Sequence, residues 1–362
     1  IRAAAAKAGV TVQVAGGVPA MCDGVTQGQP GMELSLFSRD VIALAAGVAM
    51  SHDCFDAALY LGVCDKIVPG LVMAAATFGH VPAVFVPAGP MTSGIPNDQK
   101  SKVRNAWAEG RATREELMAA EMASYHGPGT CTFYGTANTN QMLMELMGLH
   151  LPGASFVNPG TPLREALTVA AVERAAAITA LGNDFRPAGE VLDERAYVNG
   201  IVGLMATGGS TNAVLHFLAI AHAAEVEWTI DDFERMRRRV PVLCDLKPSG
   251  QYVATDLHRA GGIPQVLKIL LNAGLLHGDC ITITGRTMAE ELAGVPDQPR
   301  ADQDVIRPFD KPMYAQGHLA ILKGNLAPEG CVAKITGLKN PSITGPARVF
   351  NSEPEVVDAI LA

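Results

Sequence analysis

Hydrophobic residues along this chain form two kinds of run, which predict two kinds of element. Short apolar runs bounded by glycine, proline or polar turns predict buried strands, and longer runs of helix-forming residues predict helices. The clearest expected strands cover residues 10–14, 57–63 and 81–86. The expected helices cover residues 38–51, 71–78, 97–125, 141–149, 163–181 and 212–223, with a further helix capped by Thr229.

Two of these strands, 57–63 and 81–86, are separated by one short helix and therefore predict a βαβ unit. The strands of such a unit are parallel, so the loops that follow them lie at the same carboxyl edge of the sheet. Open α/β sheets bind ligands at that edge. We therefore expect residues 1–278 to form an α/β domain, with a parallel-type sheet flanked by helices.

The pattern changes after about Asp279. Short β-like runs at 280–284, 318–322 and 331–335 are joined by Gly, Pro and Asn turns. We expect residues 279–362 to begin a smaller, mostly β, barrel-like domain that remains incomplete at Ala362. The chain starts as Ile-Arg-Ala-Ala-Ala-Ala-Lys, without Met and in the style of a helix interior, so we expect that the natural N-terminus lies elsewhere.

Composition excludes several classes of protein. The chain has 362 residues, of which 48% are hydrophobic, so it can bury a large core. A net charge of -8 argues against a nucleic-acid partner, which needs clustered basic surface. No apolar run approaches the roughly 20 residues that span a bilayer, and the first residues given do not show the basic-then-apolar pattern of a signal peptide. We expect a cytoplasmic enzyme without a membrane partner.

The seven cysteines include no Cys-x-x-Cys pair, so neither a zinc ribbon nor a thioredoxin-like motif is indicated. Without an export signal, reduced thiols are expected. Three polar clusters in glycine-rich loops contain a cysteine: residues 21–24, 64–66 and 129–131. For any one of them the simpler interpretation is a small buried thiol or ordinary turn chemistry.

Position favours a functional interpretation of Cys64, Asp65 and Lys66. Side chains at the carboxyl end of a buried strand project into the crevice, where a lysine is normally avoided. A thiolate suits iron and a carboxylate suits magnesium, so the pair suggests an iron–sulfur cluster beside a hard divalent cation. Asp23 could supply a second carboxylate, and Cys131 a second thiolate.

Two further loops could hold an anion. Thr136 and Asn138 stand near a predicted helix start, and Ser210 and Thr211 follow Gly208-Gly209 at another. The unpaired N–H groups of a helix N-terminus favour a carboxylate or phosphate, although ordinary N-capping is the simpler interpretation of either loop taken alone. His126 is a candidate general base beside Cys131, with a structural histidine as the alternative.

Five stretches that contain these residues resemble the dihydroxy-acid dehydratase/6-phosphogluconate dehydratase family. They are GGVPAMCDGVTQGQPGMELSLFSRDVIA (16–43), LGVCDKIVPGLVMAA (61–75), HVPAVFVPAGPMTSG (80–94), GTCTFYGTANTNQM (129–142) and VNGIVGLMATGGSTN (198–212). The first, second and fourth resemble the 6-phosphogluconate branch. The resemblance implies loss of water from 6-phospho-D-gluconate, giving 2-dehydro-3-deoxy-6-phosphogluconate in the Entner–Doudoroff pathway.

The resemblance also implies roles for particular residues. Cys64 and Cys131 match cysteines that bind an iron–sulfur cluster, for which we expect the 4Fe–4S rather than the 2Fe–2S type. Asp23 and Asp65 match carboxylates that bind magnesium, and Lys66 matches a lysine whose carboxylated amine binds the same ion. The substrate would be a small phosphorylated sugar acid, with Thr136, Asn138, Ser210 and Thr211 as candidate contacts, and the protein a homodimer.

In the family the catalytic base is a serine of the C-terminal β domain, which we expect beyond residue 362. We therefore expect this chain alone to be catalytically incomplete. The alternatives are a dehydratase of the same family acting on a dihydroxy acid or another sugar acid, and a cysteine-nucleophile transferase using Cys131 and His126. A non-catalytic binding module is a further alternative.

Overall fold

The computed structural model describes nearly all of the chain, and the described residues form two units. The positions outside the described residues are Gly16, Val18, Pro19, Met21, Cys22, Ser93, Tyr125, His126, Phe133, Lys339 and Pro341. The larger unit joins Ile1–Met91 to Pro128–Thr336, and the smaller unit joins Thr92–Gly127 to Gly337–Ala362. The expected domain boundary near residue 279 stays a prediction.

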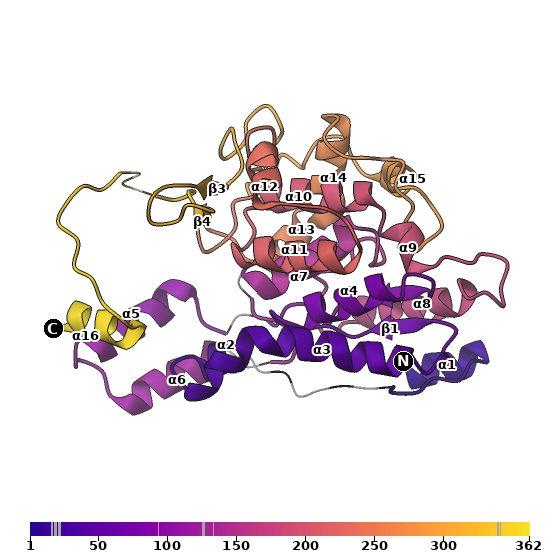
Figure 1. Ribbon diagram of the computed structural model, residues 1–362, viewed down its shortest axis with the longest axis horizontal. Coiled ribbons are helices and arrows are strands. Elements are labelled where there is room, and N and C mark those ends of the chain that lie inside the picture. Colours follow the sequence, from indigo (N-terminus) through magenta and orange to yellow (C-terminus); the bar gives the residue numbers. More distant parts are fainter. Residues whose placement is uncertain are drawn as a thin grey trace. The chain divides into compact units, whose positions relative to one another are not determined.

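The larger unit is a mixed α/β structure that is mostly helical (Figure 1). Its strands form a parallel pair, β1 (Ala58–Tyr60) with β2 (Ala83–Phe85), and an antiparallel pair, β3 (Leu319–Leu322) with β4 (Cys331–Lys334). Its helices are α1 (Arg2–Ala8), α2 (Asp23–Thr26), η1 (Pro30–Leu34), α3 (Ser35–Met50), α4 (Ile67–Thr77), α7 (Thr136–Leu146), α8 (Pro162–Ala177), α9 (Ala188–Val191), α10 (Glu194–Thr207), α11 (Asn212–Ala223), α12 (Ile230–Arg237), α13 (Ala254–Arg259), α14 (Gly262–Asn272), α15 (Met288–Glu291) and η2 (Leu292–Gly294). The α/β prediction is confirmed at this level, whereas the described residues after 279 form no barrel.

The predicted βαβ unit consists of β1, α4 and β2. α4 starts earlier than expected because Pro69 lies in its first turn, where the missing proline N–H would have no helical partner in any case. Gly70 follows, and a Cβ there would lie 2.5 Å from Arg39 O. Glycine thus allows α3 to pack closely against α4, and the two helices lie alongside each other in Figure 1.

A third segment joins the carboxyl edge of this sheet. Thr130 N donates to Gly89 O at 2.9 Å, and Met91 N donates to Thr130 O at 2.8 Å. Gly129, at a φ of 120°, allows the two loops to meet, since a Cβ there would lie 2.6 Å from Gly89 O. Cys131 is therefore carried to the edge where the loop after β1 also lies.

Two helices, α7 and α10, run through the core. All of α7 after Thr136 is buried, and so is nearly all of α10. Gly203 of α10 faces Leu146 of α7 so closely that a Cβ would lie 2.1 Å from Leu146 Cδ2. Because α7 has no solvated face, its polar side chains must find partners within the protein.

Several predicted elements differ from the structure. The strand expected at 10–14 is irregular, with Val14 76% exposed, and among the described residues no strand pairs with it. The helix expected to be capped by Ser38 begins at Ser35, and Ser38 Oγ instead donates to Ser35 O at 2.6 Å. The run at 280–284 contributes only an isolated bridge between Ile281 and Thr287. In the two strand cases, the apolar run lacks a partner strand among the described residues.

The helix start at Thr229 is confirmed. Thr229 and Asp232 form a reciprocal capping box at the start of α12. Across the described part of the chain, every helix is too short or too polar to cross a lipid bilayer.

The smaller unit contains α5 (Asn97–Ala108), α6 (Arg114–Ser124) and α16 (Glu353–Leu361). The single helix predicted over 97–125 is therefore two, divided near Gly110, which has a φ of 71°. α5 packs against α6 through ion pairs of Lys100 and Arg104 with Glu121. Among the described residues of this unit, no hydrophobic side chain is fully buried.

Candidate metal site

Cys64, Asp65 and Lys66 form the turn between β1 and α4. Cys64 has a φ of 68°, a left-handed backbone that is uncommon outside glycine. Asp65 and Lys66 are only 7% and 9% exposed, although both carry charges. The turn thus brings two buried ionic groups to the carboxyl edge of the sheet, as the sequence pattern predicts.

The Lys66 ammonium lies between two carboxylates. Lys66 Nζ donates to Asp23 Oδ2 and to Asp65 Oδ2. Asp23 begins α2, and its other carboxylate oxygen accepts a hydrogen bond of 2.6 Å from Ser35 Oγ at the start of α3. Asp65 Oδ1 lies 3.3 Å from Nε2 of His216 on α11. Four separate segments therefore meet at this ionic cluster.

The contacts within this ionic cluster keep Asp65 and Lys66 charged although both side chains are buried. Burial on its own would raise the pKa of Asp65, but hydrogen bonds from His216 and Lys66 and the lysine charge lower it well below its usual range. Burial would likewise lower the pKa of Lys66, yet the hydrogen bonds to Asp23 and Asp65 raise it above the ordinary value. Asp65 and Lys66 are therefore both charged at neutral pH.

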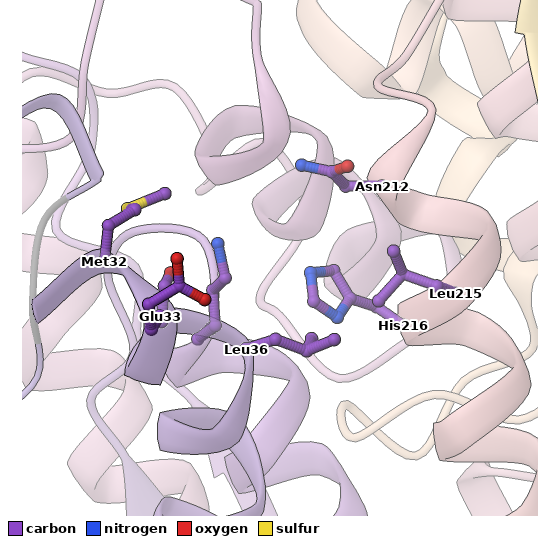
Figure 2. Close-up of a pocket in the computed structure, with 8 residues that line it drawn as sticks. Met32, Glu33, Leu36, Asn212, Leu215 and His216 are labelled. Atoms are coloured by element: carbon purple, nitrogen blue, oxygen red, sulfur yellow. The ribbon is translucent and has the colours of Figure 1, made fainter. Parts of the chain in front are cut away.

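A cavity of about 350 Å³ opens beside these charges. Its lining residues are Met32, Glu33, Ser35, Leu36, Lys66, Asn212, Leu215 and His216. Figure 2 shows Met32, Glu33 and Leu36 on one wall and the α11 residues on the opposite wall. The cavity thus combines an ionic end with an amide and two leucine side chains.

The two cysteines implied by the resemblance are both half-buried. Cys64 lies in the turn described above, and the Cys131 carbonyl accepts a hydrogen bond of 2.6 Å from Asn138 Nδ2. Within the described residues, no group of three or more His, Cys, Asp or Glu side chains is arranged to hold a metal ion. His126, the candidate base, lies outside the described residues.

The two predicted anion loops form one cluster of hydroxyl and amide groups. Thr136 Oγ1 and Ser210 Oγ are 2.8 Å apart, and Asn212 Nδ2 donates to Thr136 Oγ1 at 3.1 Å. Thr211 is the N-cap residue of α11 but makes no side-chain cap bond. Asn138 hydrogen-bonds to Thr130 Oγ1 and to the Cys131 carbonyl, and its expected substrate contact stays a prediction.

Sequence reasoning missed His216, Ser35 and Asn212. Asn212 and His216 are one helical turn apart after a Gly-Gly loop, so they share a face of α11. That spacing alone is a weak indication of a functional site, because it does not predict which loop packs against this face of α11. The partners of His216 and Ser35 lie far from them in sequence.

Comparison with known proteins identifies the class to which this fold and site belong. A model of the N-terminal region of dihydroxy-acid/6-phosphogluconate dehydratases matches residues 1–291, and the corresponding C-terminal model matches residues 304–362. The chain therefore belongs to the dihydroxy-acid/6-phosphogluconate dehydratase family.

Individual relatives carry two different names. The chain is 56% identical over 376 residues to the phosphogluconate dehydratase of Rhizobium meliloti (strain 1021), covering 100% of this chain and 62% of that protein. It is 49% identical over 373 residues to the phosphogluconate dehydratase of Escherichia coli (strain K12), covering 100% of this chain and 62% of the relative. It is also 52% identical over 366 residues to the dihydroxy-acid dehydratase of Albidiferax ferrireducens, covering 99% and 64%. The chain thus spans less than two thirds of each relative, and identity alone does not separate the two substrates.

Proposed function

We propose that this chain carries the metal-binding part of a dehydratase that removes water from 6-phospho-D-gluconate. The product is 2-dehydro-3-deoxy-6-phosphogluconate, an intermediate of the Entner–Doudoroff pathway. The observation that carries this proposal is the meeting of Asp23, Asp65 and Lys66 at the end of a cavity, next to the Cys64 turn. The relatives named phosphogluconate dehydratase support the choice of substrate.

The donor chemistry fits Mg²⁺. Asp23 and Asp65 offer the carboxylate oxygens that this ion prefers. We propose that Lys66 is carboxylated on its amine in the active protein, which makes it a third oxygen ligand. Two carboxylates and an ammonium sum to a charge of −1, and two carboxylates, a carbamate and Mg²⁺ also sum to −1. Carboxylation of Lys66 together with binding of Mg²⁺ therefore leaves the net charge of the site unchanged. An added net charge away from water would be unfavourable.

Cys64 and Cys131 fit an iron–sulfur cluster, since thiolates are the usual ligands of such clusters. Both are half-buried, and their loops lie at one edge of the β1–β2 sheet. A 4Fe–4S cluster bound there would supply a Lewis acid for the hydroxyl group that leaves the substrate.

The remaining site residues bind and orient the substrate. The proton on C2 leaves to a base, the hydroxyl on C3 leaves as hydroxide, and the resulting enol becomes the 2-keto acid without net oxidation. Asp23, Asp65 and a carboxylated Lys66 would hold Mg²⁺, which would stabilise the negative charge that the substrate carboxylate gains. Thr136, Ser210 and Asn212 offer donors to hydroxyl or phosphate oxygens, and Asn212 shares the cavity with Lys66.

The direct test is the metal content and substrate preference of the protein purified without oxygen. We expect a brown protein that contains iron, sulfide and Mg²⁺. Cys64→Ser should lose most of the iron, whereas the exposed Cys54→Ser should retain it. A wild-type protein that stays free of iron and sulfide after anaerobic reconstitution would contradict the proposal.

A second candidate is dehydration of a dihydroxy acid, which the relative from Albidiferax ferrireducens favours. A comparison of kcat/KM for 6-phosphogluconate, gluconate and 2,3-dihydroxyisovalerate, measured on the full-length enzyme, separates the candidates. We expect 6-phosphogluconate to be preferred, and a preference for 2,3-dihydroxyisovalerate would favour the second candidate. A cysteine-nucleophile transferase would instead be colourless and inactivated by thiol alkylation.

A further inference from the structure

Consecutive polar side chains of α7 contact separate segments around the candidate site. Asn138 Nδ2 donates to the carbonyl of Cys131, as described above. Thr139 Oγ1 accepts a hydrogen bond of 3.1 Å from Ser210 N, at the loop that precedes α11. One helix thus contacts both the second cysteine loop and the hydroxyl cluster.

The next two residues of α7 contact the first cysteine turn. Asn140 Nδ2 donates to Asp65 O at 2.7 Å, and Gln141 Nε2 donates to Gly62 O at 2.9 Å. Both side chains are almost fully buried, at 2% and 1% exposed. The two accepting carbonyls lie on either side of Cys64 in the chain, so the amides hold the turn before and after the cysteine.

The backbone of Cys64 needs such support. Its φ of 68° is unfavourable for a residue with a Cβ, because the side chain crowds the backbone in the left-handed region. Such a conformation persists only where the surrounding structure fixes it. The hydrogen bonds to the Gly62 and Asp65 carbonyls hold the peptide groups 62–63 and 65–66, which restricts the two peptide groups of Cys64 between them.

We propose that Asn140 and Gln141 are positioning residues that fix the Cys64 turn on α7, the same helix that holds the Cys131 loop through Asn138. In this arrangement α7 sets the separation between the two cysteine thiols before any cluster is present. This inference rests on the proposed function, because the separation of the two thiols matters only if both bind one cluster. The contacts themselves are independent of the metal.

The test replaces each amide by an apolar side chain of similar size, as Asn140→Leu and Gln141→Met. Two buried amides elsewhere in the core provide matched controls. Asn199 Nδ2 donates to His277 O at 3.0 Å, and Gln265 Nε2 donates to Pro296 O at 2.8 Å, with exposures of 0% and 3%. Asn199→Leu and Gln265→Met therefore remove the same kind of bond from sites that do not contact the Cys64 turn.

Hydrogen–deuterium exchange of the metal-free protein is the first measurement. We expect the backbone amides of 62–66 to exchange at least about tenfold faster in Asn140→Leu and Gln141→Met than in the wild type. In the two control variants they should exchange at the wild-type rate. Equal exchange of 62–66 in test and control variants would overturn the proposal.

Iron content after anaerobic reconstitution is the second measurement. We expect the test variants to bind less than about half of the wild-type iron and the controls to bind all of it. Full iron binding by the test variants would overturn the positioning role, whereas absence of iron in the wild type would overturn the proposed function alone. If an apolar variant fails to fold, Asn140→Ala and Gln141→Ala remove the donor without adding a buried charge and undergo the same measurements.

Discussion

Glu145 shows how one buried side chain can make stability depend on pH near neutrality. It is 4% exposed and accepts hydrogen bonds from Gly153 N at 2.6 Å and from Ser155 N at 3.1 Å. The hydroxyl of Ser155 donates to the same carboxyl group and lies 3.1 Å from His150 Nδ1. Burial raises the pKa of Glu145 to about 7, although these hydrogen bonds act to lower it.

This pKa predicts a loss of stability as pH rises. In the unfolded chain the carboxyl group titrates near its ordinary value of 4.5, so between that pH and about 7 only the folded chain keeps the proton. The contribution is complete below pH 4.5 and is lost as pH rises through 7. We expect Glu145→Gln to remove about 2–3 kcal/mol of the wild-type decrease in unfolding free energy between pH 5 and 8. Denaturant unfolding across this range measures it, and equal slopes for both proteins would contradict the prediction.

At the residue scale, the sequence predicts which charged residues of the candidate site lie together, but it does not predict the residues that hydrogen-bond to them. Asp23, Asp65 and Lys66 were expected together because of the family resemblance, and they are in contact in the structure. Their metal-binding role stays a prediction. His216 was missed because its partner Asp65 is 151 positions away, and no local pattern encodes such a contact. The roles of Asn140 and Gln141 were hidden for the same reason.

At the scale of elements, the closeness of α7 to α10 depends on small residues. Gly203 leaves no room for a methyl group, because Leu146 fills the space with its own buried side chain. Gly47, in the interior of α3, is different, since a Cβ there would meet only Phe78 Cε2 at an ordinary 3.7 Å. The same substitution should therefore have opposite effects in the two helices.

We expect Gly203→Ala to lower the free energy of unfolding by about 1–3 kcal/mol, through overpacking against Leu146. Gly47→Ala should raise it by about 0.5–1 kcal/mol, because alanine has the higher helix propensity and fits the site. Denaturant unfolding of the two variants beside the wild type provides the comparison. Destabilisation by both substitutions to the same extent would show that the packing at Gly203 does not decide the effect.

Helices and strands were predicted correctly where the local pattern of apolar residues determines them. The prediction failed where contacts with distant segments determine the structure. The βαβ unit was predicted because its two apolar strands are bounded by polar residues, glycine or proline, and Pro69-Gly70 introduces the helix between them. The start of α7 was predicted too late, because Thr136–Asn140 are polar or small and resemble a loop in sequence. They are helical in the structure because buried carbonyls and hydroxyls accept or donate their hydrogen bonds.

At the scale of the whole molecule, the two units differ in how much apolar surface they bury. Among the described residues, every fully buried hydrophobic side chain belongs to the larger unit, and α5, α6 and α16 of the smaller unit contain none. Apolar burial supplies most of the resistance to local unfolding, so the smaller unit should open more readily.

Limited trypsin digestion tests this difference. Arg111 lies between α5 and α6 with 67% of its side chain exposed, and Arg300 of the larger unit is 58% exposed. We expect cleavage at Arg111 at least about tenfold faster than at Arg300, because cleavage requires local unfolding as well as exposure. Mass spectrometry of the early fragments gives the order of cleavage, and first cleavage at Arg300 would contradict the expectation.

The position of Lys66 between Asp23 and Asp65 has a consequence for the stability of the fold. The lysine acts as an internal counter-ion, so the neighbouring carboxylates do not repel each other. A neutral side chain at position 66 would leave this repulsion uncompensated, which is unfavourable away from water. Lys66 therefore ties the start of α2 to the turn after β1, whatever further role its amine has.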